Sequence, residues 1–201
     1  MRQLLCRVLA SLLLVLGGAS LAAAQTETEE DDSWRFYGAL SYGRTWPTVE
    51  LLNFTTSTDL GSEVAGSLGF EMPWLRWDVV EVAYDWGDTV VGGVKGSTSL
   101  LSLGTGLRIG PFGADYLVCP YVSLGFAGGR LDTSGPAPYS QFSDWGFEWS
   151  GGLGLEVKFL ERLRVGARYR YRSLSIEFVE TAIGDVNASL DLHTLSLEVI
   201  F

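Results

Sequence analysis

The chain has 201 residues, of which 47% are apolar, and it carries 14 basic against 24 acidic side chains. Its net charge of -10 argues against a nucleic-acid partner, because binding to phosphates needs a basic surface. Beyond the N-terminal region, no stretch offers the roughly 18 consecutive apolar residues of a membrane helix. Any membrane span there would have to be made of strands.

The first 24 residues have the pattern of a secretory signal peptide. Arg2 and Arg7 precede an apolar run, and Ala22 and Ala24 stand in the A-x-A spacing that signal peptidase accepts. A permanent membrane anchor is the alternative, but glycines interrupt the run and acidic residues follow it. We expect cleavage of residues 1–24, followed by an acidic periplasmic N-terminal segment over residues 25–33.

From residue 34 onward, apolar and polar residues alternate with the period of two that β-strands with one apolar face require. Eight segments show this alternation, and each is about long enough to cross a membrane when tilted. They are residues 34–46, 62–72, 78–86, 99–109, 116–128, 145–159, 163–178 and 190–201. On the apolar faces, Leu103, Leu153 and Val165 are predicted to contact lipid.

The seventh segment breaks the alternation near its end. Arginines occupy its polar face up to Arg172, whereas Leu174 and Ile176 follow with the same spacing. If apolar residues all belong to the outward face, a β-bulge near Ser173 must shift the register. Arg172 would then lie near the outer rim and contact lipid phosphate.

The connections between segments alternate in length. Residues 47–61, 87–96, 128–144 and 179–189 form longer links, whereas those around 73–76, 110–115 and 160–162 are short. Alternation alone would also fit a soluble barrel or sandwich with an apolar core. The long and short rhythm instead favours an outer-membrane barrel, with longer loops outside and short turns in the periplasm.

The polar faces combine glycines and serines with charged side chains, which is typical of a lumen and not of a solvent-exposed face. Charges inside a narrow barrel are costly unless they are paired. We therefore predict an ion-pair network in the lumen, formed by Glu63, Glu81, Asp85, Arg108, Glu148, Glu156, Lys158, Arg164, Arg168, Arg170 and Glu198.

With these features the chain resembles the small outer-membrane β-barrel family that includes the OmpA transmembrane domain, the OmpX type and opacity-type adhesins. The resemblance covers residues 34–201. It includes the final segment, in which Leu195, Leu197, Val199 and Phe201 look like the signal that the barrel assembly machinery recognises. It implies an all-β, eight-stranded antiparallel up-and-down transmembrane β-barrel in the cell outer membrane, in contact with outer-membrane lipid and lipopolysaccharide.

The sequence offers little for catalysis. His193 is the only histidine, and the period of two places Ser196 on the opposite face of the strand, out of its reach. The Gly-x-Gly pairs lie inside predicted strands, and no acidic residues have the spacing of a metal-binding loop. We expect no enzyme activity, no cofactor and no metal.

A structural or surface-interaction role, with a lumen plugged by ion pairs, is therefore the function we predict. A narrow, porin-like diffusion channel is one alternative, which a continuous water path through the lumen would support. An adhesin that binds a host or surface ligand through its loops is the second. A periplasmic carrier of lipids or small molecules is the third, and apolar residues pointing inward would favour it.

Overall fold

The computed structural model describes residues 34–51, 54–57, 61–91, 94–113, 116–134, 141–160, 162–181 and 184–201. Their strands are β1 (Arg35–Leu51), β2 (Phe54–Ser57), β3 (Gly61–Met72), β4 (Leu75–Val91), β5 (Val94–Ile109), β6 (Val118–Ser134), β7 (Gln141–Phe142), β8 (Gly146–Leu160), β9 (Leu163–Thr181) and β10 (Gly184–Ile200). The predicted signal peptide and acidic segment fall in residues 1–33, outside the described part.

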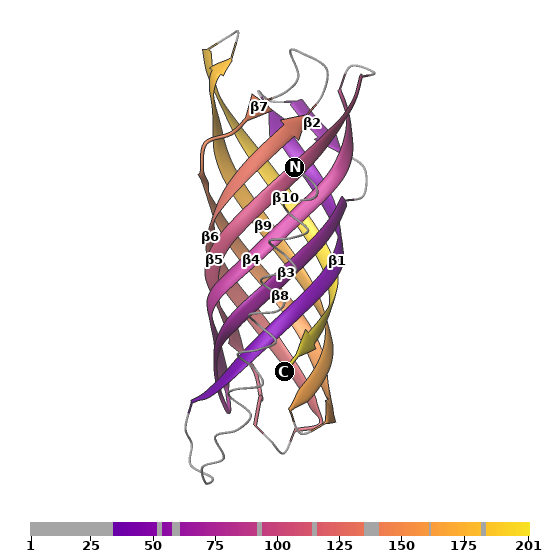
Figure 1. Ribbon diagram of the computed structural model, residues 1–201, viewed down its shortest axis with the longest axis vertical. Helices are drawn as coiled ribbons and strands as arrows, with labels where there is room; N and C mark the ends of the chain where they lie inside the picture. The colour runs from indigo at the N-terminus through magenta and orange to yellow at the C-terminus, as the bar shows by residue number, and fades with distance from the viewer. Residues whose placement is uncertain are drawn as a thin grey trace.

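Eight of these strands close into a barrel (Figure 1). They follow the order β1-β3-β4-β5-β6-β8-β9-β10, and β10 pairs with β1 to complete the circle. All the pairings are antiparallel, while the short strands β2 and β7 only extend β1 and β6. The predicted eight-stranded antiparallel up-and-down barrel is confirmed.

The cross-strand register sets the width of the barrel. From Leu40, successive partners run through Gly66, Val82, Leu103, Gly128, Phe147, Ser175 and Ser189 back to Glu50 on β1. The circuit thus returns ten residues further along the strand, which is the shear of the barrel. Eight strands with this shear tilt by about 40° and leave an interior that side chains can fill.

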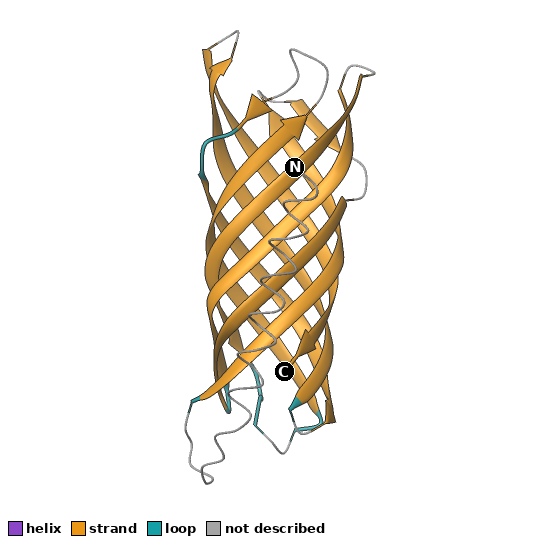
Figure 2. Cartoon of the chain, in the orientation of Figure 1, coloured by secondary structure: helices purple, strands orange, loops and turns teal. Residues whose placement is uncertain are grey.

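The two ends of the barrel differ (Figure 2). One end, called the turn end below, holds Phe201 and the connections β3–β4, β5–β6 and β8–β9. The other end, called the loop end, holds the connections β1–β3, β4–β5, β6–β8 and β9–β10. Within the described residues no helix is long and apolar enough to cross a bilayer.

Strand residues make up more than half of each of the four predicted long links, so this part of the prediction is wrong; the connections β4–β5 and β9–β10 are the clearest cases. β4 continues to Val91 and β5 begins at Val94, while β9 continues to Thr181 and β10 begins at Gly184. The sequence contains the reason for the first: β-branched residues flank Gly92-Gly93, a dipeptide that favours a two-residue hairpin. The barrel strands run to between 12 and 19 residues, whereas about 9–11 cross a membrane.

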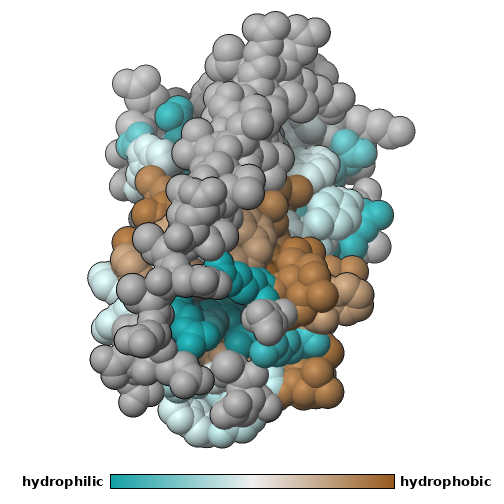
Figure 3. Space-filling model, turned by 60° about the horizontal axis from the view of Figure 1, so that its bottom comes forward, coloured by the Kyte–Doolittle hydropathy of each residue, from teal (hydrophilic) through white to brown (hydrophobic). Residues whose placement is uncertain are grey.

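Side chains alternate between the interior and the outer surface as the period of two predicts. Leu103, Leu153 and Val165 are 52%, 61% and 43% exposed on the outer surface, where lipid was predicted. Figure 3 shows hydrophobic side chains gathered on the wall of the barrel. Charged and small residues occupy the interior positions of the same strands.

The predicted bulge near Ser173 is wrong. The register of β9 with β8 and β10 runs without a shift through Ser173, so Leu174 and Ile176 stay on the interior face with Arg172. The prediction failed because it assigned every apolar residue to the outside. A register shift lies instead in β4, between Asp78 and Glu81, where Val79 and Val80 are both exposed.

Candidate functional site in the barrel lumen

The candidate site is the interior face of the barrel, where strands from all sides bring charged residues together. At the turn end, Arg76 on β4 contacts Glu156 on β8 through Nη1 and Oε1 at 2.6 Å, and Glu71 on β3 through Nε and Oε2 at 2.5 Å. Arg164 on β9 lies 3.5 Å from the same Glu71 oxygen.

An aromatic ring is buried at this end. Phe112, in the link between β5 and β6, is fully buried, and its amide donates to the carbonyl oxygen of Pro73 at 2.7 Å. The guanidinium of Arg76 stacks over the ring, 4.1 Å from its centroid. A guanidinium over an aromatic face is a favourable contact when both groups are desolvated.

Arg108 on β5 lies at the centre of the next level. Its Nε lies 2.9 Å from Oδ2 of Asp78 and its Nη1 lies 3.0 Å from Oε2 of Glu198. Two tyrosine hydroxyls bind the same carboxylates: Tyr121 donates a hydrogen bond to Glu198 at 2.6 Å, and Tyr37 donates one to Asp78. Each carboxylate therefore has both a cation and a hydroxyl to offset its desolvation.

Further toward the loop end, three arginines of β9 extend this series of ion pairs into a column along the barrel. Arg168 lies 3.1 Å from Glu198 and 3.5 Å from Glu81. Arg170 pairs with Glu81 and, at 2.7 Å, with Glu63.

Arg172 is completely buried at the top of the column. It contacts Glu63 at 3.3 Å, Asp85 at 2.5 Å and Glu148 at 3.8 Å. Ser102 donates a hydrogen bond to Glu148 at 2.7 Å. The prediction that Arg172 lies at the outer rim and meets lipid phosphate is wrong, because no bulge turns it outward.

Arg108 Nη1 also lies 3.9 Å from Glu156 Oε1, and this contact joins the turn-end pairs to the others. Together the contacts form one chain of alternating charges, which we call the lumen network. Its members in the described residues are Arg76, Arg108, Arg164, Arg168, Arg170 and Arg172 with Glu63, Glu71, Asp78, Glu81, Asp85, Glu148, Glu156 and Glu198. The side chains are at most 15% exposed. Such burial is tolerable only because the partners face one another across the barrel.

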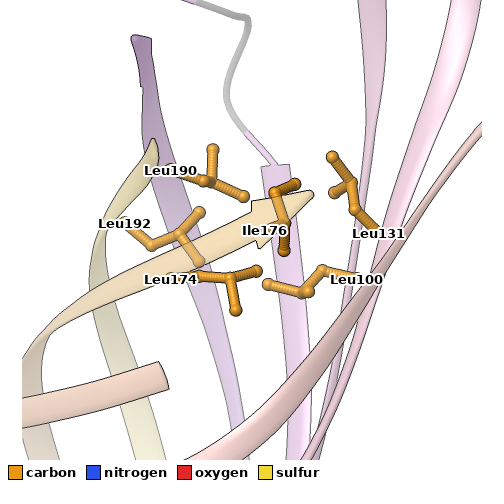
Figure 4. Close-up of a cluster of buried hydrophobic side chains, with 6 residues drawn as sticks. All are labelled: Leu100, Leu131, Leu174, Ile176, Leu190 and Leu192. Carbon is orange, nitrogen blue, oxygen red and sulfur yellow. The ribbon is translucent and has the colours of Figure 1, made fainter. Parts of the chain in front are cut away.

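Above Arg172 the interior becomes apolar (Figure 4). Six side chains form a buried cluster that we call the apolar cap: Leu100, Leu131, Leu174, Ile176, Leu190 and Leu192. They come from β5, β6, β9 and β10 and are at most 7% exposed. The lumen thus has a buried aromatic ring toward the turn end, charges in the middle and aliphatic side chains toward the loop end.

Two cavities border the lumen network in the described residues, and both are small. A cavity beside Arg168 and Glu198 has no room for a water molecule. A second, beside Glu148 and Arg170, holds about 20 Å³, close to the minimum for one water.

The structure brings ten of the eleven residues of the predicted site into the lumen network. Lys158 is the eleventh; it is half-buried at the turn end and pairs in register with Arg164. The predicted site left out four members of the network: Glu71, Arg76, Asp78 and Arg172. Arg76 and Asp78 were missed because the register shift in β4 moves them onto the interior face. The sequence signal for this shift was the two adjacent valines, Val79 and Val80, which are both exposed in the structure.

On the outer surface, aromatic residues gather near both ends of the barrel wall. Trp34, Phe36 and Phe70 lie toward the turn end, and Trp34 and Phe36 each pack edge-on against Phe70. Near the loop end, the rings of Trp149, Tyr171 and His193 follow one another at centroid distances of 5.3 and 5.2 Å. Such belts are typical of the two interfaces of an outer-membrane barrel.

His193 has no catalytic neighbours in this setting. Its Nδ1 shares a hydrogen bond of 2.7 Å with the hydroxyl of Tyr169 on the outer surface, whereas Ser196 is buried in the interior. No group of His, Cys, Asp and Glu side chains in the described residues could hold a metal ion. The absence of enzyme activity stays a prediction.

The final strand contributes to closure of the barrel. Leu195, Leu197 and Val199 are exposed on the outer surface, and Phe201 exchanges two backbone hydrogen bonds with Gly38, of 2.8 and 2.9 Å. A Cβ atom at Gly38 would lie 2.8 Å from the Phe201 ring, so this position favours glycine. Recognition of these residues by the barrel assembly machinery stays a prediction.

Residues 11–201 match the family described as outer membrane protein beta-barrel domain. The chain belongs to this family. Its predicted place in the outer membrane is therefore confirmed. No curated protein matches the sequence.

Solved structures resemble the chain in fold. Neisserial surface protein A has a TM-score of 0.54 and 14% identity, over 83% of this chain and 98% of that one. OprG from Pseudomonas aeruginosa has a TM-score of 0.55 and 11% identity, over 83% and 95%. Ail, the attachment invasion locus protein of Yersinia pestis, has a TM-score of 0.46 and 14% identity, over 82% and 98%. At such identities the likeness concerns the fold alone.

Proposed function

We propose that this protein has a structural or surface-interaction role in the outer membrane and that its lumen is plugged at rest. The observation that carries the proposal is the succession of buried groups along the interior: Phe112, then the lumen network, then the apolar cap. A porin-like channel needs a continuous water path, and the two cavities beside the network hold at most about one water.

Three closures in series would block ions. An ion would meet the ring of Phe112 at the turn end and the ion pairs of Arg168 in the middle. Toward the loop end it would meet Leu174 and its apolar neighbours. Passage requires an ion to lose water at each level, which is costly in an apolar or already paired environment. Opening one closure should therefore leave the other two in place.

Planar bilayer recordings test this arrangement. The wild-type protein and the single variants Phe112→Ala, Arg168→Ala and Leu174→Ala should show no steady conductance, whereas the triple variant should conduct. A matched control combines Leu103→Ala, Phe126→Ala and Arg130→Ala, which alter outward-facing positions of the barrel wall. Heat-modifiable migration on a detergent gel shows that each variant is folded.

A large, steady conductance of the wild-type protein, unchanged in the triple variant, would reject the plugged lumen and favour the porin-like alternative. Conductance of the control variant alone would also reject the proposal, because it would locate the ion path outside the lumen.

The loop end is the part of the barrel suited to contacts with a host or surface ligand. β4, β5, β9 and β10 have 16 to 19 residues, more than the membrane needs, so their loop-end hairpins should project from it. Replacing residues 89–96 by an Asn-Gly turn should reduce attachment of expressing cells to a surface. Replacing a connection at the turn end by the same turn should leave attachment unchanged. Equal attachment of both variants would argue against the loop-mediated role.

A further inference from the structure

Arg44 is one of the arginines that face outward and not into the lumen. Arg44 is exposed on the outward face of β1, and the residues before and after it on that face are Tyr42 and Trp46, which are 54% and 42% exposed. A charge on the lipid face is costly in the hydrocarbon and tolerable near the headgroups. The position of Arg44 along the barrel therefore decides what it can contact.

The register places Arg44 in the aromatic belt near the loop end. It lies opposite Ser62 on β3 and Leu195 on β10, and the same row continues to Trp86 on β4. In the adjacent row, Trp46 lies opposite His193, which pairs with Tyr171. Aromatic belts mark the headgroup level, so Arg44 lies beside the headgroups of the outer leaflet when the loop end faces outward.

Arg44 also differs from the arginines of the lumen in its partners. Its hydrogen bond to the Ser62 hydroxyl is long, at 3.5 Å, and no carboxylate of the described residues lies within ion-pair distance. By contrast, Arg108 and Arg172 each contact several carboxylates. Most of the donors of the Arg44 guanidinium are therefore available to a ligand.

A second donor lies diagonally across the strand pair. His193 belongs to the row next to Arg44, within reach of a long side chain, and its ring is held by the Tyr169 hydroxyl through Nδ1. Leu195 and Leu197 lie below it toward the turn end and are 53% and 69% exposed. The carboxylate of Asp191 lies on the other side, opposite Thr48, nearer the loop end.

We propose that Arg44, with His193 beside it, binds the phosphate of an outer-leaflet lipid, and that the ligand is lipid A. The planar guanidinium matches a phosphate with two parallel hydrogen bonds, and the exposed leucines below offer an apolar surface for an acyl chain. The site is on the outside of the barrel, so it does not depend on whether the lumen conducts.

Native mass spectrometry of the full-length protein in detergent tests the proposal, with lipid A and chemically dephosphorylated lipid A as probes. The wild-type protein should retain lipid A and bind the dephosphorylated form about tenfold more weakly, the expected loss for one strong charge-assisted contact. Arg44→Ala should lose the same factor, and Arg44→Lys should recover part of it, because lysine keeps the charge without the planar fork.

Arg35→Ala is the matched control, because Arg35 is an exposed arginine on the same strand at the turn end. It should bind lipid A as the wild type does. Arg44→Gln, which keeps a hydrogen-bonding side chain without the charge, replaces the alanine variant if that variant does not fold. Unchanged binding by the Arg44 variants, or an equal loss in Arg35→Ala, would overturn the proposal, as would equal binding of the two probes.

Discussion

The lumen network, which forms a column of charges, and the apolar cap are both buried on the interior of the same barrel, yet they fill it in different ways. β9 contains both: Arg172 contacts three carboxylates, and two residues later Leu174 is buried among aliphatic side chains. In the column, each side chain depends on a partner of opposite charge on another strand. In the cap, any apolar group of the right volume would serve. The two regions should therefore respond differently to substitution.

The largest effect is expected in the column. Arg172→Met removes the cation but leaves Glu63, Asp85 and Glu148 buried beside one another. Uncompensated buried charge costs about 3–5 kcal/mol, so the free energy of unfolding should fall by that amount. Urea unfolding in lipid vesicles, followed by tryptophan fluorescence, measures it.

A combined variant distinguishes charge from packing as the cause. Adding Glu63→Gln and Asp85→Asn to Arg172→Met removes most of the surplus negative charge and should restore a large part of the lost stability. If the combined variant is no more stable than Arg172→Met, packing and not charge pairing determines stability in the column.

A smaller effect is expected in the cap. Leu174→Ala removes a side chain that is 0% exposed and should leave a cavity, at a cost of about 3 kcal/mol. The same substitution at Leu155, which is 48% exposed to lipid, should cost clearly less, because lipid chains can fill the space. Equal losses in the two urea titrations would show that the cap is not packed as a core.

The sequence predicted the inside and outside of most strands because a barrel imposes a strict period of two. On β8, for example, Leu153 and Leu155 face outward while Glu148 and Glu156 are buried, as their alternation indicates. The ion pairs could be anticipated as a group, since a closed barrel leaves charges on that face no other partners. Which arginine meets which carboxylate depends on the shear and was not predictable from one strand at a time.

The errors have a common physical cause, which is that the two ends of the barrel relax the rule of polar inside and apolar outside. Leu174 is apolar and buried in the lumen, so the alternation there seemed to need a bulge near Ser173. Phe112 lies in a link that the sequence presents as a short turn, yet its ring is fully buried at the turn end. Arg44 was not predicted because it lies on the outward face of β1, whereas the predicted charges lie on the polar faces of the strands.

The outer wall allows a third comparison, between a position near the bilayer midplane and one near the interface. Leu153 is 61% exposed in the middle of β8, so Leu153→Arg should place a charge near the bilayer midplane and cost about 2–4 kcal/mol. Leu160→Arg, at the turn end of the same strand, should cost at most about 1 kcal/mol, because the interface tolerates the charge. Folding yields into vesicles should rank the variants in this order. Similar yields for both would contradict the placement of Leu153 near the bilayer midplane.

The smallest effect is expected from salt, and it tests whether the column is truly closed. Exposed charges are screened within about 10 Å at 0.1 M ionic strength and about 3 Å at 1 M, whereas buried pairs are screened much less. The pairs of Arg172 and Arg108 are almost completely buried. The stability difference between wild type and Arg172→Met should therefore change by less than about 0.5 kcal/mol when KCl is raised from about 0.1 to about 1 M. Measuring the difference between two proteins cancels the general effect of salt on apolar burial, which is the same in both. A difference that shrinks by more than about 1 kcal/mol would mean that ions reach the column, and it would favour a water-filled lumen over a plugged one.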